Sequence, residues 1–423
     1  MGNLVFRDLD LCAPSSQPFL SAVAAKNGVS IRQAASFVER LFLLRSDWCP
    51  GLCFVGGQAP PAQMDQRYGD LPAFSLAGAG EEPEIAFAAC VGEAVERLSQ
   101  LEQRSDIHCS SPLSDIRDRL LPGLASLLSD ARTQIGFEEH AAYDWVEGSN
   151  LTNAASVLIP ADWCLRRAKS ESKLKPRSAL STGAAAGPTL EAATERALLE
   201  LVERDAVSLW WRGGRRGRPL PLELAAAQKG MELVQALRQD KLDRASWLLD
   251  LTTDIGIPSV AAVSFDKHGQ GLACGFAARV NLDEAVRAAI IEMMQMELGL
   301  QLAQTKQERM GESALSEVDR LHLRRSTAID SETCDLVHPA GKPAVVIEPE
   351  RRPPIAVLKA AFARSSIDVA IVNLTRDQFG IPVVFALAPG LQPMPSSTTT
   401  PRLRSMFSAA EFNERKIPDV ALF

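Results

Sequence analysis

Two pairs of glutamates stand out in this sequence because an arginine follows each pair at the same spacing. The pairs and their arginines are Glu93, Glu96 and Arg97, and then Glu200, Glu203 and Arg204. Residues three apart share one face of a helix, so each pair presents two carboxylates side by side. Taken singly, such a pair is typical of a solvated helix face. Two such pairs brought together would repel each other unless a cation neutralised them.

Each pair ends a longer repeated pattern. Glu93 lies nine residues after Glu84, and Glu200 lies nine residues after Glu191. A glycine stands four residues before each of these upstream glutamates. A third, looser copy contains Asp283, Glu292 and Gln295, again with a step of nine between its two acidic residues. The repetition indicates that helices carrying the pattern pack side by side.

The chemistry that suits this pattern is a Mg²⁺-nucleotide site. Hard oxygen ligands favour Mg²⁺, which proteins usually share with the phosphates of a substrate. Arg204, Arg97 and Arg287 are candidate partners for those phosphates. Backbone N–H groups at the turns before the helices could also face an anion. The alternative is a pseudo-symmetric scaffold whose charged helices pair only with one another.

Composition limits the class of protein. The chain has 423 residues, 46% hydrophobic and 23% charged, with a formal net charge of −7. These values are typical of a globular protein and do not suggest a nucleic-acid partner. No apolar run is long enough for a membrane helix, and the first residues do not resemble a secretory signal. Cys49 and Cys53 form the one close cysteine pair, so we expect no cysteine metal site and a cytoplasmic location.

The elements that would position the glutamates are mixed in type. Apolar spacing predicts helices over 33–44, 83–101 and 190–211, and two strand–turn–strand units over 246–266 and 368–390. The basic stretch 166–177 and most of 303–345 are expected to be surface loops, and the tail after Leu391 to be extended or mobile. The predicted fold is α+β, with mixed sheets packed against helices and internally repeated. The predicted divisions are an N-terminal region of unclear role (1–70), a central domain (71–392) and a Pro/Ser/Thr-rich tail (393–423).

The central stretch resembles the signature of the YcaO family. The residues that carry this resemblance are GAAAGPTLEAATERALLELVERDAVSLWW. Further similar stretches follow the same order: GEAVERLS, WVEGSNL with VLIPADW, LDEAVRAAIIEMMQ and FGIPVVFALAPGLQ. The resemblance covers about 73–392 and leaves 1–70 without a counterpart.

The resemblance implies ATP and Mg²⁺ as cofactors and assigns roles to the glutamates. It implies that the Mg²⁺ ligands are Glu93, Glu96, Glu200 and Glu203. It also implies a nucleotide site that includes Arg204, Glu292, Gln295, Glu191 and Arg287. The chain departs from the family at 185–188, where apolar residues stand in place of Ser and Asn, and its end lacks the alternating prolines of many azoline-forming members.

The resemblance further implies the reaction. Family members activate a peptide backbone amide by phosphorylating its oxygen, most often to turn Cys, Ser or Thr into azoline rings in a ribosomally made peptide. The alternatives are a thioamide, formed with a sulfur-delivering partner, an amidine, or a non-catalytic accessory subunit. The implied partners are a precursor peptide and a separate protein that binds its leader, with no nucleic acid and no membrane. RGGRRGR at 212–218 could meet an acidic leader or be a solvated loop. A homodimer is one of the oligomeric states left open.

Overall fold

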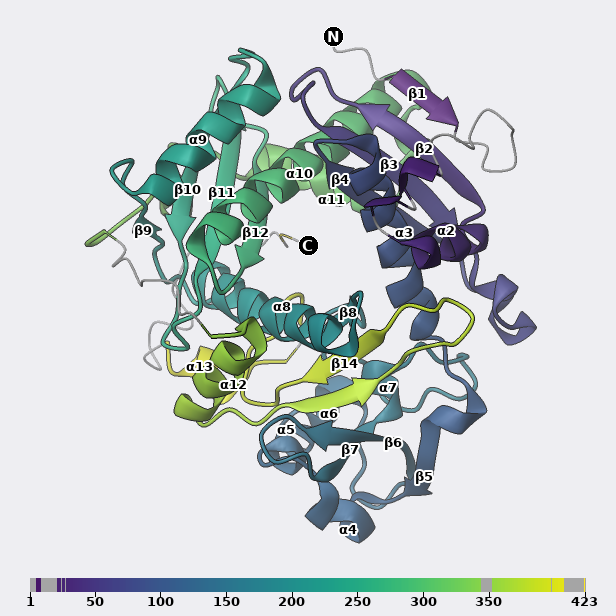
Figure 1. Cartoon of the computed structure of the whole chain (residues 1–423). Helices are drawn as coiled ribbons and strands as arrows, with labels where there is room; N and C mark the ends of the chain where they lie inside the picture. The colour runs from purple at the N-terminus through teal and green to yellow at the C-terminus, as the bar shows by residue number, and fades with distance from the viewer. Residues whose placement is uncertain are drawn as a thin grey trace.

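The structure is a computed structural model that describes residues 5–8, 21–23, 25–26, 28–343, 352–396, 398–406 and 422. The described residues form three antiparallel sheets (Figure 1). Helices pack against each sheet, which confirms the predicted α+β fold.

The first sheet has the strand order β1-β2-β3-β4. Its strands are β1 (Val5–Asp8), β2 (Arg40–Arg45), β3 (Cys53–Ala59) and β4 (Phe74–Gly80). Helix α3 (Pro83–Ser99) packs on β3 and β4, with Phe87, Val91 and Leu98 among its buried residues. The short helix α2 (Val29–Ala34) contacts α3. This sheet joins residues on both sides of position 70, and the predicted domain divisions stay a prediction.

The helix predicted over 33–44 is wrong. Helix α2 ends at Ala34, a 3₁₀ turn follows, and Arg40–Arg45 forms β2. In the run RLFLL, Leu41 and Leu44 are buried and the two residues between them are half-buried, so side chains on both faces of the strand are at least partly covered. Strand β2 pairs with β1 on one side and with β3 on the other. These non-local hydrogen bonds outweigh a local helical pattern.

The second sheet has the order β12-β11-β10-β9. Its strands are β9 (Arg218–Pro219), β10 (Arg244–Asp250), β11 (Ser259–Asp266) and β12 (Ala273–Ala278). The antiparallel pairing of β10 with β11 confirms the first predicted strand–turn–strand unit. Helix α10 (Leu282–Met310) covers β11 and β12, and α9 (Ala225–Arg238) and α11 (Glu317–Ala328) pack on α10. Helix α11 was expected to be loop; its start is a capping box in which Ser316 and Asp319 satisfy each other's backbone N–H groups.

The third sheet has the order β5-β6-β13-β14-β8, with β7 paired to β6. Its strands are β5 (Ile107–Ser111), β6 (Tyr143–Asn150), β7 (Ser156–Pro160), β8 (Ala184–Ala186), β13 (Ala370–Asn373) and β14 (Val383–Leu387). The pairing of β13 with β14 confirms the second predicted unit. Its accompanying helices are α4 (Leu113–Ile116), α5 (Leu124–Asp130), α6 (Arg132–Ile135), α7 (Ala161–Cys164), α8 (Leu190–Trp211) and α12 (Pro354–Arg364).

Three strand–helix units pack against one another in a ring. The units are β4–α3, β8–α8 and β12–α10, and in each the helix packs on the strand that precedes it. Each helix also contacts the strand of another unit: α3 contacts β8, α8 contacts β12, and α10 contacts β4. Figure 1 shows the three helices around a common centre. The contacts therefore run in a cycle, while the predicted internal repetition of the whole fold stays a prediction.

The expectation of an extended or mobile tail is wrong for its described part. Thr398 and Thr400 are buried, and a short helix, α13 (Pro401–Arg404), follows them. Asp205 of α8 accepts hydrogen bonds from the backbone N–H of Gln392 and from Arg402. The buried carboxylate of Asp205 thus holds this segment against α8.

Helix α8 begins with a capping residue that the sequence supplies. The side chain of Thr189 accepts a hydrogen bond from the backbone N–H of Ala192, 3.1 Å away. Replacing Thr189 by Ala is expected to lower the free energy of unfolding by about 1 kcal/mol, because one N–H at the start of the helix loses its acceptor. Urea denaturation measures this loss. Thr189→Ser keeps the hydroxyl and serves as the control; an equal loss in both variants would contradict the capping role.

Candidate active site

Each of the three helices directs one carboxylate at the backbone of its own strand. Glu93 accepts a hydrogen bond from the N–H of Ala77 at 2.7 Å. Glu200 accepts from the N–H of Gly183, just before β8, at 3.0 Å. Glu292 accepts from the N–H of Phe276 at 2.9 Å. All three glutamates lie ten residues after the start of their helix, so the same local geometry is built three times.

The second residue of each pair faces the next unit. Glu96 of α3 accepts a hydrogen bond from the N–H of Ala186 in β8 at 2.8 Å. Glu203 of α8 faces the backbone N–H of Ala278 in β12. Gln295 occupies the corresponding position on α10 and is half-buried. The pairs therefore join neighbouring units, and the spacing of three residues is what lets one helix face serve two strands.

Arg204 lies among these carboxylates. Its guanidinium is 3.4 Å from Glu200 and 3.5 Å from Glu203. Burial acts to lower the pKa of Arg204, but the charges of Glu203, Glu200 and Glu292 outweigh it and raise that pKa. This arginine therefore stays charged and links the carboxylates of α8 to that of α10.

The carboxylates hold their protons unusually tightly. Burial is the first cause, and it raises the pKa of Glu96 to about 8, of Glu200 to about 7 and of Glu292 to about 8. Burial also raises the pKa of Glu203. Repulsion between neighbouring glutamates adds to the effect, since Glu200 and Glu93 act on Glu96, and Glu203 acts on Glu292. Without a ligand, the site thus takes up protons in place of a cation.

The structure places two predicted residues outside this cluster. Glu191 is exposed in the first turn of α8. Arg287 is exposed on α10 and forms an ion pair with Glu81, which lies between β4 and α3. Their roles in nucleotide binding stay predictions.

Several groups at the site were not identified from the sequence. Arg279 follows β12 directly, and its charge acts on Glu203 and Glu292. Arg196 donates a hydrogen bond to the carbonyl of Ala186 and acts on Glu96. Arg196 lies in the predicted helix 190–211, and Arg279 lies four residues before Asp283 of the third glutamate pattern, so these positions were the available signal. The backbone N–H donors leave no signal in the sequence, because any residue can supply them.

The apolar loop at 185–188 contributes backbone rather than side chains. Ala185 and Ala186 belong to β8, and their side chains are buried in the core. At the site the N–H of Ala186 binds Glu96, and the carbonyl of Ala186 accepts from Arg196. The absence of Ser and Asn in this loop therefore leaves its hydrogen bond to the glutamate cluster intact.

The basic segment 212–218 is bound to the chain itself. Arg212 and Arg215 donate to backbone carbonyls in 396–398 and 251–252. Arg216 contacts the carbonyl of His338, and Arg218 pairs with Asp250. The segment is a half-buried loop after α8, and whether it meets a leader peptide stays a prediction.

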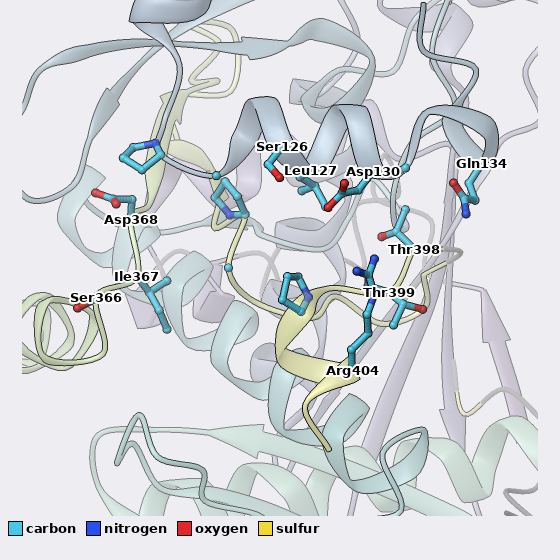
Figure 2. Close-up of a pocket in the computed structure, with 16 residues that line it drawn as sticks. Ser126, Leu127, Asp130, Gln134, Ser366, Ile367, Asp368, Thr398, Thr399 and Arg404 are labelled. Atoms are coloured by element: carbon cyan, nitrogen blue, oxygen red, sulfur yellow. The ribbon is translucent and has the colours of Figure 1, made fainter. Parts of the chain in front are cut away.

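A cavity of about 400 Å³ opens away from the glutamates. It lies between α5, α6, the turn after α12, and α13. Figure 2 shows Arg404 extending into it from α13 toward the side formed by Ser126 and Asp130. Its lining contains none of the glutamates discussed above, so size alone does not identify the reactive site. The convergence of charged groups and shifted pKa values favours the glutamate cluster.

The raised pKa values predict a pH-dependent stability. The ordinary value of a glutamate is 4.5, and the folded values of Glu96 and Glu292 are about 8. The folded state therefore binds more protons than the unfolded state between these limits, so this contribution is complete below the lower limit and is lost as pH rises through the upper one. We expect the melting temperature of the ligand-free chain to fall across that window, and to fall less in Glu292→Gln. The same slope in both chains would contradict the assignment.

Comparison with known proteins identifies the family. A model of the YcaO family, described as cyclodehydratases that bind ATP and Mg²⁺, matches residues 77–392. An uncharacterized protein from Methanothermobacter thermautotrophicus is 26% identical over 334 residues, covering 75% of this chain and 81% of that protein.

Solved structures share the fold. A heterocyclase in complex with substrate and cofactor is 22% identical with a TM-score of 0.71, covering 91% of this chain and 54% of its own. YcaO from Methanopyrus kandleri, bound with AMPPCP and Mg²⁺, is 18% identical with a TM-score of 0.59, covering 89% of this chain and 91% of its own. The Escherichia coli microcin synthetase McbBCD complex contains a chain 14% identical with a TM-score of 0.59, covering 80% of this chain and 85% of its own. The present chain thus spans about half the length of the heterocyclase.

The family match extends across the glutamate pairs, Arg204 and the third helix. It confirms the predicted enzyme class and the predicted cofactors, ATP and Mg²⁺. Within the described parts of the chain, every helix is too short or too polar to cross a bilayer. The chain belongs to the YcaO family of ATP- and Mg²⁺-binding cyclodehydratases.

Proposed function

We propose that this chain activates a backbone amide of a peptide at the expense of ATP, at the site formed by the glutamates of α3, α8 and α10. The observation that carries the proposal is the convergence of these carboxylates with Arg204. In a purely structural scaffold, several buried carboxylates that repel one another would cost free energy without a compensating gain. The same arrangement is what a Mg²⁺-nucleotide requires.

The residues present fit Mg²⁺. Glu93, Glu96, Glu200 and Glu203 supply hard oxygen ligands, and Glu292 adds a fifth carboxylate nearby. Among the residues that the structure describes, no group of three or more His, Cys, Asp or Glu side chains is arranged so that it could hold a metal ion by itself. Mg²⁺ is typically held by one or two carboxylates, with water and substrate phosphates completing its six positions. The donor set therefore suits an ion that arrives with a nucleotide.

The chain's own residues would then orient the nucleotide and neutralise the negative charge on its phosphates. ATP with Mg²⁺ would supply a phosphoryl group to the amide oxygen. The oxygen, a poor leaving group, could then leave as phosphate, which is a good one. Arg204 is placed to stabilise negative charge on that group, since it stays protonated among the carboxylates. The backbone N–H groups of β4, β8 and β12 keep the glutamates oriented.

The product that we propose is an azoline ring. The hydroxyl or thiol of a Ser, Thr or Cys adds to the preceding carbonyl carbon, the oxygen leaves as phosphate, and the peptide loses one water per ring. The family description as cyclodehydratases and the heterocyclase with the same fold support this choice. A thioamide product, which exchanges oxygen for sulfur, and a non-catalytic accessory role are the alternatives.

We also propose a separate partner that presents the precursor peptide. The microcin synthetase with the same fold was solved as a complex of several chains. In this chain the arginines of 212–218 make internal contacts, so we propose that the leader binds to the partner and not to this segment. The cytoplasmic location and the homodimer stay predictions.

Mass spectrometry tests the proposal. The chain is incubated with ATP, Mg²⁺, a candidate partner and a Cys/Ser/Thr-rich precursor peptide. We expect loss of one water per modified residue together with release of one phosphate. Exchange of oxygen for sulfur would indicate the thioamide reaction instead. An unchanged peptide, with no nucleotide binding by calorimetry, would contradict both enzyme readings and favour the accessory role.

A further inference from the structure

A small cavity adjoins the glutamate cluster on the side of β14. Its volume is about 20 Å³, which is room for roughly one water-sized group. Arg204 lines it and also contacts Glu200 and Glu203, so one side chain is shared by the cavity and the cluster. The other lining residues lie at Trp163, Arg177, Ser178, Thr182, Leu201, 385–388 and 391–393.

Arg177 is a buried cation whose bonding capacity is largely unused. Only 4% of its surface is exposed. Its Nη2 donates to the carbonyl of Leu391 at 2.9 Å, whereas Nε and Nη1 have no hydrogen-bond partner among the described residues. Burial lowers the pKa of Arg177 to about 10, so the guanidinium remains charged at neutral pH. The segment around it was expected to be an exposed loop, and the structure corrects this for Arg177 and for Leu174, which is also buried.

The backbone holds Arg177 in this position. The hydroxyl of Ser396 donates to the carbonyl of Arg177, and Ser178 pairs with Ser396 in an isolated bridge. The neighbouring indole Nε1 of Trp163 is also buried without a partner among the described residues. The guanidinium carbon of Arg177 lies 6.0 Å from the centre of that indole ring. Two residues that carry unpaired donors, Arg177 and Trp163, thus line one small cavity.

The lining contains two arginines and no aspartate or glutamate. A buried charge without a counterion is costly, and buried donors without acceptors add to the cost. Such a site is favourable once an anion enters. The small volume admits about one oxygen atom of that anion.

We infer that Arg177, with Trp163 and Arg204, forms a binding site for a phosphate oxygen. This inference rests on the proposed function and deepens it. The cavity receives one oxygen of the phosphate that leaves the activated amide, beside the glutamate cluster. Arg177 binds this anion and is not a metal ligand. The alternative is a purely structural role, in which Arg177 only ties the 391–393 segment to the third sheet.

Binding of inorganic phosphate to the full chain, without ATP and Mg²⁺, tests the inference. Calorimetry or ³¹P NMR line broadening follows the titration. Wild type is expected to bind phosphate saturably, and Arg177→Met to bind it roughly tenfold to a hundredfold more weakly, because a charge-assisted hydrogen bond is lost. Arg177→Lys restores part of the affinity by restoring the charge. Arg215→Met is the matched control, since Arg215 contacts the carbonyls of Leu251 and Thr252 and does not line the cavity.

Thermal melting separates binding from folding. If Arg177→Met is unstable, the comparison uses Arg177→Lys, which we expect to weaken phosphate binding because it loses the forked donors. Equal phosphate affinity in wild type and in folded Arg177 variants would overturn the inference, as would a wild type that binds no phosphate. Phosphate binding that depends on Arg177 in a chain that never turns over ATP would leave the cavity assigned and refute the proposed function. ATP turnover in a chain that binds no phosphate would support the proposed function and refute the assignment of the cavity.

Discussion

Glu200→Gln is expected to abolish Mg²⁺-dependent release of phosphate from ATP, with a loss of at least about a hundredfold to a thousandfold in turnover. The amide keeps the shape of the side chain and can still accept the N–H of Gly183. It lacks the charge that a divalent cation requires, and it leaves Arg204 with one carboxylate fewer. The change therefore removes electrostatic stabilisation while preserving the fold.

Two measurements make this result specific. Phosphate release is measured with saturating ATP over a range of Mg²⁺ concentrations, and calorimetry gives the affinity for Mg²⁺-ATP. Glu308→Gln is the matched control, because Glu308 lies on α10 but is exposed in its last turns. Turnover close to wild type in Glu200→Gln would remove this residue from the site. A loss in both variants would point to a general effect of charge.

Gly275→Ala is expected to destabilise the chain by about 3 kcal/mol and to weaken Mg²⁺-ATP binding at the same time. A Cβ at this position would lie 2.1 Å from the carbonyl oxygen of Ala289 and 2.1 Å from the nitrogen of Met293. Both are backbone atoms of α10, so the helix would have to move away from β12. Glu292 precedes Met293, and its hydrogen bond to Phe276 would be lost with that movement.

Gly92→Ala is expected to change the stability in the opposite direction from Gly275→Ala. Gly92 lies inside α3, and a Cβ there meets no atom within 4 Å. Alanine in a helix interior is more favourable than glycine by about 0.5–1 kcal/mol, so this variant is expected to be slightly more stable than wild type. Urea denaturation gives both changes in free energy. If Gly275→Ala unfolded like wild type, the close approach of β12 and α10 would not be needed to hold Glu292.

Local patterns in the sequence predicted the helices that carry the site. Helix α3 occupies Pro83–Ser99, and α8 occupies Leu190–Trp211, close to the predicted ranges. Both begin with signals that neighbouring residues supply, such as the cap at Thr189 and the proline at Pro83. The spacing of the glutamates could be interpreted for the same reason, because three residues along a helix is a local distance.

Non-local contacts account for the failures. The RLFLL run looked helical, and it became β2 because it pairs with β1, more than thirty residues earlier, and with β3, the next strand along the chain. The stretch before Arg177 looked like an exposed loop, yet Arg177 is buried against Leu391, more than two hundred residues away. The composition of a short segment contains no information about such partners.

The sequence by itself determined which side chains could do chemistry and how they are grouped. They form pairs of glutamates, each followed by an arginine, on helices that follow glycine turns. These features depend on residue type and on spacings within a few turns of helix. Only the tertiary structure decided what the pairs face. It set the N–H of Ala186 against Glu96 and that of Phe276 against Glu292, and it enclosed Arg177 beside Arg204. The reason is physical: burial and repulsion among carboxylates arise only when separate units pack, and this packing raises their pKa values toward 8.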